Sequence, residues 1–306
     1  MVRFVALGDS ITVGLGDPKP RHTWRGWAAL LAESLGPPGT VEFHNLAELG
    51  AQSHTLASSQ LPAAVDLKPT IAAVIVGVND TLRGSFHIGR TGAALNRTVR
   101  ELRGTGAIVL TCVLPDPGRM LRLPNALARQ LGRRIRAVNA VIEEIAALND
   151  TVHFDACSQA EIYDRRMWSV DRLHPSEAGH RMLARAFAEL LVQREFPVHS
   201  LPSPVPTNPP PKASESIRWM ATKGTKWVLD RSTDLVPTLL AMCVVEWWHR
   251  GLGLASRVDL RLTEDVVRTL GLLREELALG ALRAELDLFR GELAMTAAEH
   301  AAPAGE

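Results

Sequence analysis

Short apolar runs alternate with amphipathic stretches along the first two-thirds of the chain, and this alternation restricts the fold more than any other feature. Three of the runs read as strands buried on both faces, namely residues 2–7, 71–76 and 107–114. Weaker strand candidates lie at 40–46 and 151–155. Helical patterns occupy residues 23–35, 54–66, 88–103, 125–148 and 176–195. Strand and helix alternating in this way predict a doubly wound parallel sheet, in which sites form beyond the carboxyl ends of the strands.

Two of the expected helices begin at a residue that can cap them. Thr23 and Ser176 have side-chain oxygens suited to the N-cap position of the first and the last helix. Glu177 adds negative charge to the first turn of the last helix, where the helix dipole favours it.

Composition and charge exclude several classes of protein. The 306 residues are 46% hydrophobic and 22% charged, which is typical of a globular chain with a sizeable core. A formal net charge of +1 gives no general attraction to nucleic acid, so no nucleic-acid partner is expected. The three cysteines, Cys112, Cys157 and Cys243, form no CxxC pair, so neither a disulfide framework nor a zinc cluster is indicated. We expect no cofactor. Ser10 follows the first strand too closely for a signal peptide, which predicts a cytoplasmic location.

A shift in composition divides the chain. Residues 197–212 contain seven prolines and predict a semi-extended linker, because proline lacks the N–H that helices and central strands need. We therefore expect a catalytic domain at 1–196, this proline-rich linker at 197–212, and an α-helical region at 213–306. Docking, a lid over the site and homo-oligomerisation are the roles open to that last region.

The C-terminal region combines apolar stripes with tryptophans and basic residues. Its most apolar run, 235–248, contains Pro237 and Glu246 and is too short to span a bilayer. Apolar residues then recur in steps of 4, 3 and 4, and the phase changes near Gly280, which predicts two amphipathic helices or one with a phase break. Tryptophan beside lysine or arginine also suits a membrane-surface helix, but we favour a helix packed on a domain.

Residues with catalytic chemistry follow the predicted strands. Gly8-Asp9-Ser10 follows the first strand, and Gly77-Val78-Asn79-Asp80 follows another. A serine hydroxyl needs a base and oxyanion donors to act as a nucleophile. His174 can be that base, because Asp171, three residues earlier, can hold one imidazole nitrogen and leave the other for Ser10. The Ser10 amide, the Asn79 side chain and a glycine amide such as that of Gly50 can donate to the oxyanion.

These motifs, in this order, resemble the four blocks of the SGNH (GDSL-type) hydrolases, a family of esterases and lipases, over residues 1–195. The resemblance implies a flavodoxin-like three-layer α/β/α fold that acts on small-molecule esters or acylated substrates without a metal. By the resemblance Ser10 is the nucleophile, which becomes acylated, His174 the base and Asp171 its orienting partner. Ser10, Gly50 and Asn79 form the oxyanion hole. Asp9 and Asp80 match motif positions with a structural role.

Other interpretations exist for some of these residues and for the function. Ser10 can be a helix N-cap, and His180 is a histidine of a helix face rather than a metal ligand. The pocket walls are expected at 15–25, 51–55, 81–90, 115–127 and 160–170, with Arg83, Arg119, Met120 and His54 as candidate substrate-binding residues. An acyltransferase that uses the same acyl-enzyme is one alternative function. A scaffold or membrane-surface protein that acts through its C-terminal helices is the other.

Overall fold

The computed structural model describes residues 1–20, 23–121, 123–210, 214, 235–252 and 259–280. At its centre is a five-stranded sheet in the order β4-β1-β5-β6-β7. The strands are β1 (Val2–Gly8), β4 (Val41–Asn45), β5 (Ile71–Ile75), β6 (Ile108–Cys112) and β7 (Val152–Phe154). All neighbouring strands are parallel, which confirms the predicted sheet.

The strand order places a switch point between β1 and β5. The chain first moves from β1 to β4 on one side and then crosses to β5 on the other, and β1 pairs with both. Connections therefore leave in opposite directions from the carboxyl ends of β1 and β5, which opens a crevice there.

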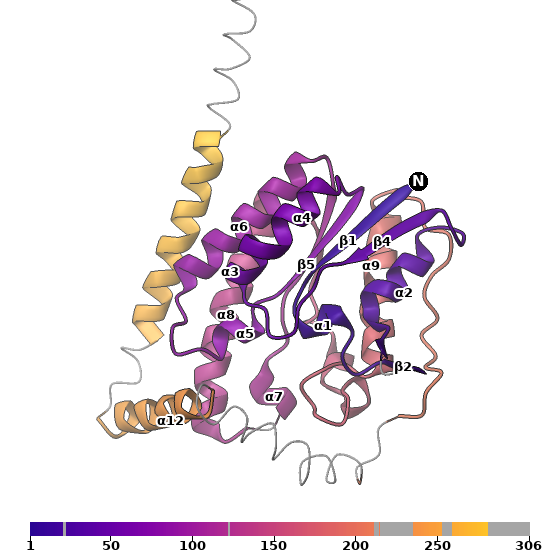
Figure 1. Ribbon diagram of the computed structural model, residues 1–306. Coiled ribbons are helices and arrows are strands. Elements are labelled where there is room, and N and C mark those ends of the chain that lie inside the picture. The colour runs from indigo at the N-terminus through magenta and orange to yellow at the C-terminus, as the bar shows by residue number, and fades with distance from the viewer. Residues whose placement is uncertain (21–22, 122, 211–213, 215–234, 253–258, 281–306) are drawn as a thin grey trace, which may run out of the picture.

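Helices cover both faces of the sheet and complete three layers (Figure 1). One layer contains α2 (Gly26–Ser34) and α9 (Glu177–Gln193), which pack against each other. The other contains α6 (Ile88–Gly104) and α8 (Asn125–Leu148). It also contains one continuous helical stretch made of α3 (Ser53–Thr55), the π-helix η2 (Leu56–Gln60) and α4 (Leu61–Asp66). This arrangement confirms the expected three-layer α/β/α fold.

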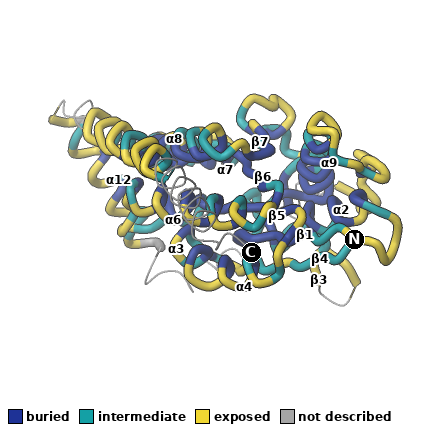
Figure 2. Tube along the Cα trace, turned by 90° about the horizontal axis from the view of Figure 1, so that it is seen from above, coloured by how far each residue is buried: buried dark blue, intermediate teal, exposed yellow. Residues whose placement is uncertain are grey.

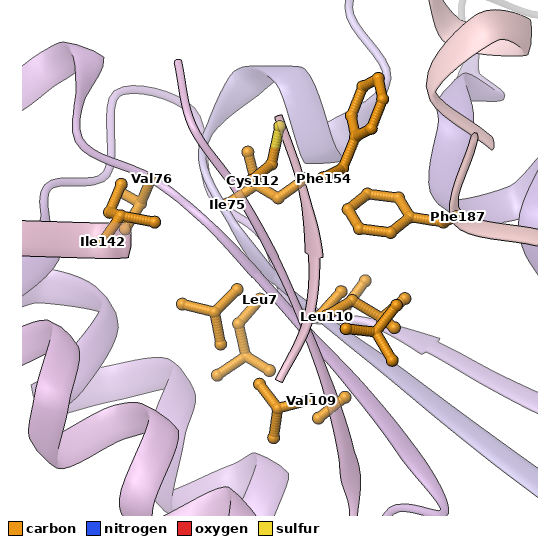
Figure 3. Close-up of a cluster of buried hydrophobic side chains, with 14 of the residues drawn as sticks. Leu7, Ile75, Val76, Val109, Leu110, Cys112, Ile142, Phe154 and Phe187 are labelled. Atoms are coloured by element: carbon orange, nitrogen blue, oxygen red, sulfur yellow. The ribbon is translucent and has the colours of Figure 1, made fainter. Parts of the chain in front are cut away.

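The core lies where the two helical layers meet the sheet. The central strands β1, β5 and β6 are buried along most of their length, as Figure 2 shows in dark blue, whereas the edge strand β4 is half-buried. Figure 3 shows Ile142 of α8 beside Val76, which follows β5, and Phe187 of α9 beside Phe154 of β7. Because apolar side chains cover both faces of β1, β5 and β6, the sequences of these strands are largely continuous apolar runs, whereas the edge strand β4 (VEFHN) alternates.

One of the two predicted helix caps is wrong. Thr23 lies in the short strand β3 (Thr23–Trp24), which pairs with β2 (Pro18–Lys19), so its hydroxyl is not at the helix start. Helix α2 begins later, after Arg25, and has no side-chain cap. Ser176 does cap α9, because its hydroxyl accepts a hydrogen bond from the Gly179 N–H at 3.4 Å.

The proline-rich segment lies against the sheet domain. Its described part, 197–210, contains no helix or strand, and the N–H of His199 donates to the Ser34 carbonyl of α2 at 2.8 Å. The described part thus has no helix or strand and is hydrogen-bonded to the domain, and its role as a linker stays a prediction.

Beyond this segment, the described C-terminal residues form helices that pack on α6 and α8. Helix α12 (Leu235–Gly251) crosses α8. Residues 259–280 are helical and bury Leu273, with Val266, Leu270 and Leu277 half-buried beside it, so the predicted 4, 3, 4 stripe is the packed one. The stripe predicted after Gly280 lies outside the described residues. None of the described helices combines the length and the apolar character needed to cross a bilayer, and the cytoplasmic location stays a prediction.

Candidate active site

Ser10 lies at the switch point because β1 ends two residues before it. Asp9 is the N-cap of the short helix α1 (Ser10–Val13), and its carboxylate accepts a hydrogen bond from the Ile11 N–H at 3.0 Å. The first residue of a helix exposes its side chain and its N–H at the positive end of the helix dipole. Within the described part of the chain, the Ser10 N–H has no hydrogen-bond partner.

His174 and Asp171 come from a tight loop before α9. Arg172 adopts a left-handed backbone conformation with φ of 57°, which reverses the chain between the two side chains. One oxygen of Asp171 accepts hydrogen bonds from the N–H groups of Leu173 and His174 at 2.9 and 3.0 Å. The Ser169 hydroxyl donates to the same oxygen at 2.7 Å. These bonds fix the carboxylate within its own turn.

The loop brings three side chains into one line of hydrogen bonds. His174 Nδ1 lies 2.7 Å from the other oxygen of Asp171. His174 Nε2 lies 2.8 Å from Ser10 Oγ, across 164 residues of sequence. The structure therefore brings together the serine, histidine and aspartate that the sequence singled out.

Two carboxylates in this site have opposite pKa shifts. Burial alone would raise the pKa of Asp171, but the hydrogen bonds from His174 and Ser169 and the charge of His174 outweigh it and lower the pKa to about 2. Asp9 is also buried, and there burial prevails over the Ile11 hydrogen bond and raises the pKa to about 6. Asp171 thus stays ionised throughout the physiological range, while Asp9 titrates just below neutrality.

The oxyanion candidates lie on two neighbouring loops. Asn79 is in α5 (Val78–Thr81), and its Nδ2 donates to Asp9 at 3.3 Å and to the Ala51 carbonyl at 3.0 Å. Gly50, with φ of +75°, is the residue before Ala51, so the Asn79 amide ties its loop to the crevice. Asp80 ties the same loops, because its carboxylate accepts from the Ser53 hydroxyl at 2.6 Å and from the Ser53 N–H at 3.0 Å.

A small cavity of about 30 Å³ opens beside Ser10 and His174. Its walls include Leu82, Trp168 and two residues of α7 (Pro117–Leu121), Pro117 and Met120. Three of the expected wall regions, 81–90, 115–127 and 160–170, therefore contribute to it.

The other candidate substrate residues lie elsewhere. Arg119 stacks on the Tyr163 ring at 3.6 Å and lines a different cavity. His54 lines a third cavity with Asp80 and Arg90. Arg83 is half-buried, and its carbonyl accepts a hydrogen bond from Arg134 at 2.8 Å. Of the four candidates only Met120 is among the described residues of the cavity beside Ser10, and the roles of all four stay predictions.

His180 lies on α9, as expected, and is part of the core. It is fully buried in α9, where Nδ1 accepts from the Trp27 N–H at 3.2 Å and Nε2 donates to the Leu15 carbonyl at 2.9 Å. Burial lowers the pKa of His180 to about 4. The neutral ring thus joins α2, α9 and the loop after α1.

A larger cavity of about 840 Å³ lies on the other side of the loop that contains Asp171. Part of its wall is the proline-rich segment, at Pro204, Pro206 and Pro209. Sequence reasoning placed these residues in a linker and assigned them no part in the site. The signal that was present is the pair Thr207-Asn208, which interrupts the prolines with two backbone N–H donors.

A three-layer α/β/α fold with Ser, His and Asp gathered at the carboxyl ends of its parallel strands defines a class of hydrolases. Comparison with known proteins identifies the branch: residues 6–182, more than half of the chain, match the model of the GDSL-like Lipase/Acylhydrolase family. The chain belongs to this family and is an ester-hydrolysing enzyme.

Individual relatives are distant. The GDSL-like esterase Rv1075c of Mycobacterium tuberculosis is 28% identical over 216 residues, which cover 66% of this chain and 67% of the relative. A single-residue variant of Axe2, an acetyl xylan esterase from Geobacillus stearothermophilus, superposes with a TM-score of 0.51 at 20% identity, over 62% of this chain and 94% of that one. The lipase/acylhydrolase from Enterococcus faecalis gives a TM-score of 0.50 at 19% identity, over 63% and 97% of the two chains. These two structures share the fold of the sheet domain.

Proposed function

We propose that the protein is a serine esterase that forms an acyl-Ser10 intermediate and needs no metal. The observation that carries the proposal is the hydrogen-bonded line from Ser10 Oγ to His174 at 2.8 Å and from His174 to Asp171 at 2.7 Å. His174 takes the Ser10 proton while Ser10 Oγ attacks the carbonyl carbon of the ester. The ionised Asp171 holds the ring orientation and stabilises the imidazolium that forms.

The tetrahedral intermediate requires donors for its oxyanion. The unpartnered Ser10 N–H is the first, and the Gly50 N–H and the Asn79 amide complete the set. The Asn79 bond to Asp9 is long, at 3.3 Å, so this N–H can turn to the oxyanion while the bond to Ala51 holds the amide in place. The intermediate then collapses, His174 protonates the leaving alcohol, and the acyl group stays on Ser10. Water activated by His174 releases it as the carboxylic acid.

The test is Ser10→Ala, with Ser58→Ala as the matched control because Ser58 is exposed and bonds only within its own turn. With p-nitrophenyl acetate we expect kcat/KM to fall about 10⁴-fold or more for Ser10→Ala and to stay unchanged for the control. Asn79→Ala should lose about 10²–10³-fold, the value typical of an oxyanion donor. Mass spectrometry after treatment with an organophosphorus ester should find the adduct on Ser10. A Ser10→Ala variant with full activity would overturn the proposal.

Product analysis separates hydrolysis from acyl transfer. With an alcohol acceptor added to the assay, a hydrolase releases free acid as the main product, and this is the result we expect. A new ester as the main product would instead establish the acyltransferase alternative.

A further inference from the structure

Helix α12 exposes one whole face, and this face is apolar. No described residue of α12 that is exposed has a charged side chain. The large exposed residues are Leu240, Val244, Val245, Trp247 and Trp248, with Leu252 directly after the helix. They recur at spacings of three and four residues, which places them on one side of the helix. The two tryptophans are 73% and 59% exposed, so this side has no partner within the described part of the chain.

The opposite side of α12 is attached to α8. Met242 is buried in an apolar cluster with Leu127 and Leu131. Glu246 is 1% exposed and pairs with Arg129 at 3.1 Å and with Arg133. Because this carboxylate is buried and paired, it places no negative charge on the exposed face. The packing of α12 on the domain therefore uses one side of the helix and leaves the other side for a further partner.

Helix α12 lies at the end of the molecule that contains Ser10. Figure 1 shows it at the lower end of the view, where α1 and α7 also lie. Leu82 links the two regions, because it packs against the cluster that contains Met242 and also lines the cavity beside Ser10. A partner that binds α12 therefore binds at the carboxyl end of the sheet.

The exposed face of α12 is too small to hold a second copy of the chain. A helix of 17 residues is about 25 Å long and about 10 Å in diameter, so one side of it offers about 300 Å². A stable protein–protein interface buries about 800 Å² on each partner. Two such faces placed together would form less than half of an ordinary interface.

A lipid bilayer makes no such demand on area or on shape. Helices that lie on a membrane bury one apolar face at the boundary between headgroups and acyl chains. Tryptophan is enriched at this boundary, because its ring is apolar while its indole N–H stays among polar headgroups. Adjacent exposed tryptophans on a continuous apolar face, as at Trp247 and Trp248, match this pattern.

We propose that α12 is a membrane-surface helix, which lies on a bilayer with its exposed face between headgroups and acyl chains. It lies on the bilayer rather than across it, since no described helix is long and apolar enough to span one. Because the described residues of this face carry no charge, burial of apolar surface drives the binding and anionic lipid is not required. The proposal concerns attachment and does not depend on the proposed esterase function.

Flotation with phosphatidylcholine vesicles tests the proposal on the full-length protein. We expect binding to these neutral vesicles, with a partition coefficient no lower at about 1 M than at about 0.1 M NaCl, although the Debye length falls from about 10 Å to about 3 Å. Absence of binding would overturn the proposal. Binding that needs phosphatidylglycerol and disappears at high salt would overturn it too, because another, charged surface would then be responsible.

A matched pair of variants locates the binding on α12. Val244 of α12 and Val267 of the helix at 259–280 are both 63% exposed. Val244→Asp introduces a charge into the exposed face and should lower the partition coefficient about tenfold or more, because a carboxylate is costly to bury in lipid. Val267→Asp should leave it unchanged. Equal partition coefficients for the two variants would contradict the proposal.

Tryptophan fluorescence measures whether the face enters the bilayer. Vesicles with brominated acyl chains should quench the wild type more than Trp247→Ser, while Trp24→Ser, which changes a half-exposed tryptophan of β3, should be quenched as strongly as the wild type. Equal quenching of all three proteins would mean that Trp247 stays outside the acyl region, against the proposal.

Sedimentation velocity without lipid tests the competing occupant. We expect the wild type and Val244→Asp to have the same state of association. A dimeric wild type beside a monomeric Val244→Asp would show that a second copy covers the exposed face, and the proposal would fall.

Discussion

Helices α9 and α12 each anchor themselves through a buried glutamate, yet their remaining surfaces are opposite in character. In α9, Glu177 meets Arg25 and Arg181, and Leu183, Phe187 and Leu191 are buried against the sheet domain. In α12, Glu246 is 1% exposed and pairs with Arg129 and Arg133 of α8.

The apolar residues of α12 mostly face solvent. Leu240, Val244 and Trp247 are exposed on one stripe, and Met242 is the described side chain of this helix that is buried in an apolar cluster. Helix α9 is therefore part of the hydrophobic core and makes ion pairs in addition, whereas α12 is held chiefly by ion pairs. The comparison teaches that two helices of equal length can depend on different forces, and four substitutions or conditions test this (Figure 1).

The largest effect is expected where α2 meets α9. Trp27 is fully buried, with its ring centroid 5.3 Å from that of Phe187. Trp27→Ala should lower the free energy of unfolding by about 3–5 kcal/mol, the usual cost of removing a buried aromatic side chain. Urea denaturation measures it, with the half-exposed Trp24→Ala as the control. Equal losses in the two variants would contradict the idea that α9 belongs to the core.

The second effect is local to α12. Glu246→Ala leaves Arg129 without this partner and leaves the buried Arg133 with Asp259, so we expect a cost of about 1.5–3 kcal/mol, the usual contribution of a hydrogen bond to a charged group. We expect amide hydrogens of α12 to exchange about 100-fold faster, while those of the sheet are unchanged. The control is Glu101→Ala, which removes an exposed ion pair with Arg97. Unchanged exchange in α12 would show that apolar contacts hold it after all.

As the pH falls, α12 should detach from α8 before the segment 204–210 detaches from Glu177. Burial opposes ionisation of both glutamates. Hydrogen bonds from Thr207 and Asn208 nevertheless hold the pKa of Glu177 well below its usual 4.5. Those from Arg133 and Arg129 also lower the pKa of Glu246, but by less. A lowered folded-state pKa gives stability above the unfolded pKa that is lost as pH falls through the folded one. Pepsin at stepwise lower pH should cut near α12 first. Simultaneous cleavage at 204–210 would argue against the ranking.

The smallest effect is expected on the exposed stripe. Trp247 is 73% exposed, so Trp247→Ser should change the free energy of unfolding by no more than about 0.5 kcal/mol. Met242→Ser, on the buried side of the same helix, should cost clearly more. A large loss for Trp247→Ser in the urea assay would mean that the stripe is covered in solution.

The sequence predicted those parts of the molecule that depend on local pattern. Three of the five strands follow from runs of apolar residues, and β4 and β7 lie within the two weaker candidates. Ser10, Asn79 and His174 were found because each stands in a short motif at a strand end or before a helix. The prediction of Thr23 as a cap was wrong because β2 and β3 form a hairpin, so that α2 begins only at Gly26. The residues around Thr23 have no pattern that indicates this hairpin.

Contacts between distant segments were beyond such reasoning. Glu177 was interpreted as a first-turn charge, while its partners Thr207 and Asn208 lie 30 residues away and donate backbone N–H groups that any residue except proline has. The apolar pattern of α12 likewise does not say which side faces the protein, because Glu246 is the anchoring residue and a lone glutamate normally indicates the solvent side.

The hydrogen bonds from Thr207 and Asn208 to Glu177 also determine where the C-terminal part of this protein can be removed. A fragment could end at residue 182, where the family match ends, or at 196. Either one would remove three hydrogen-bond donors from the buried Glu177 carboxylate and one wall of the 840 Å³ cavity. A fragment ending at 182 would also lose Leu183, Phe187 and Leu191 from the core, whereas one ending at 196 keeps the whole of α9. The shortest version that preserves this cavity therefore ends after Pro210.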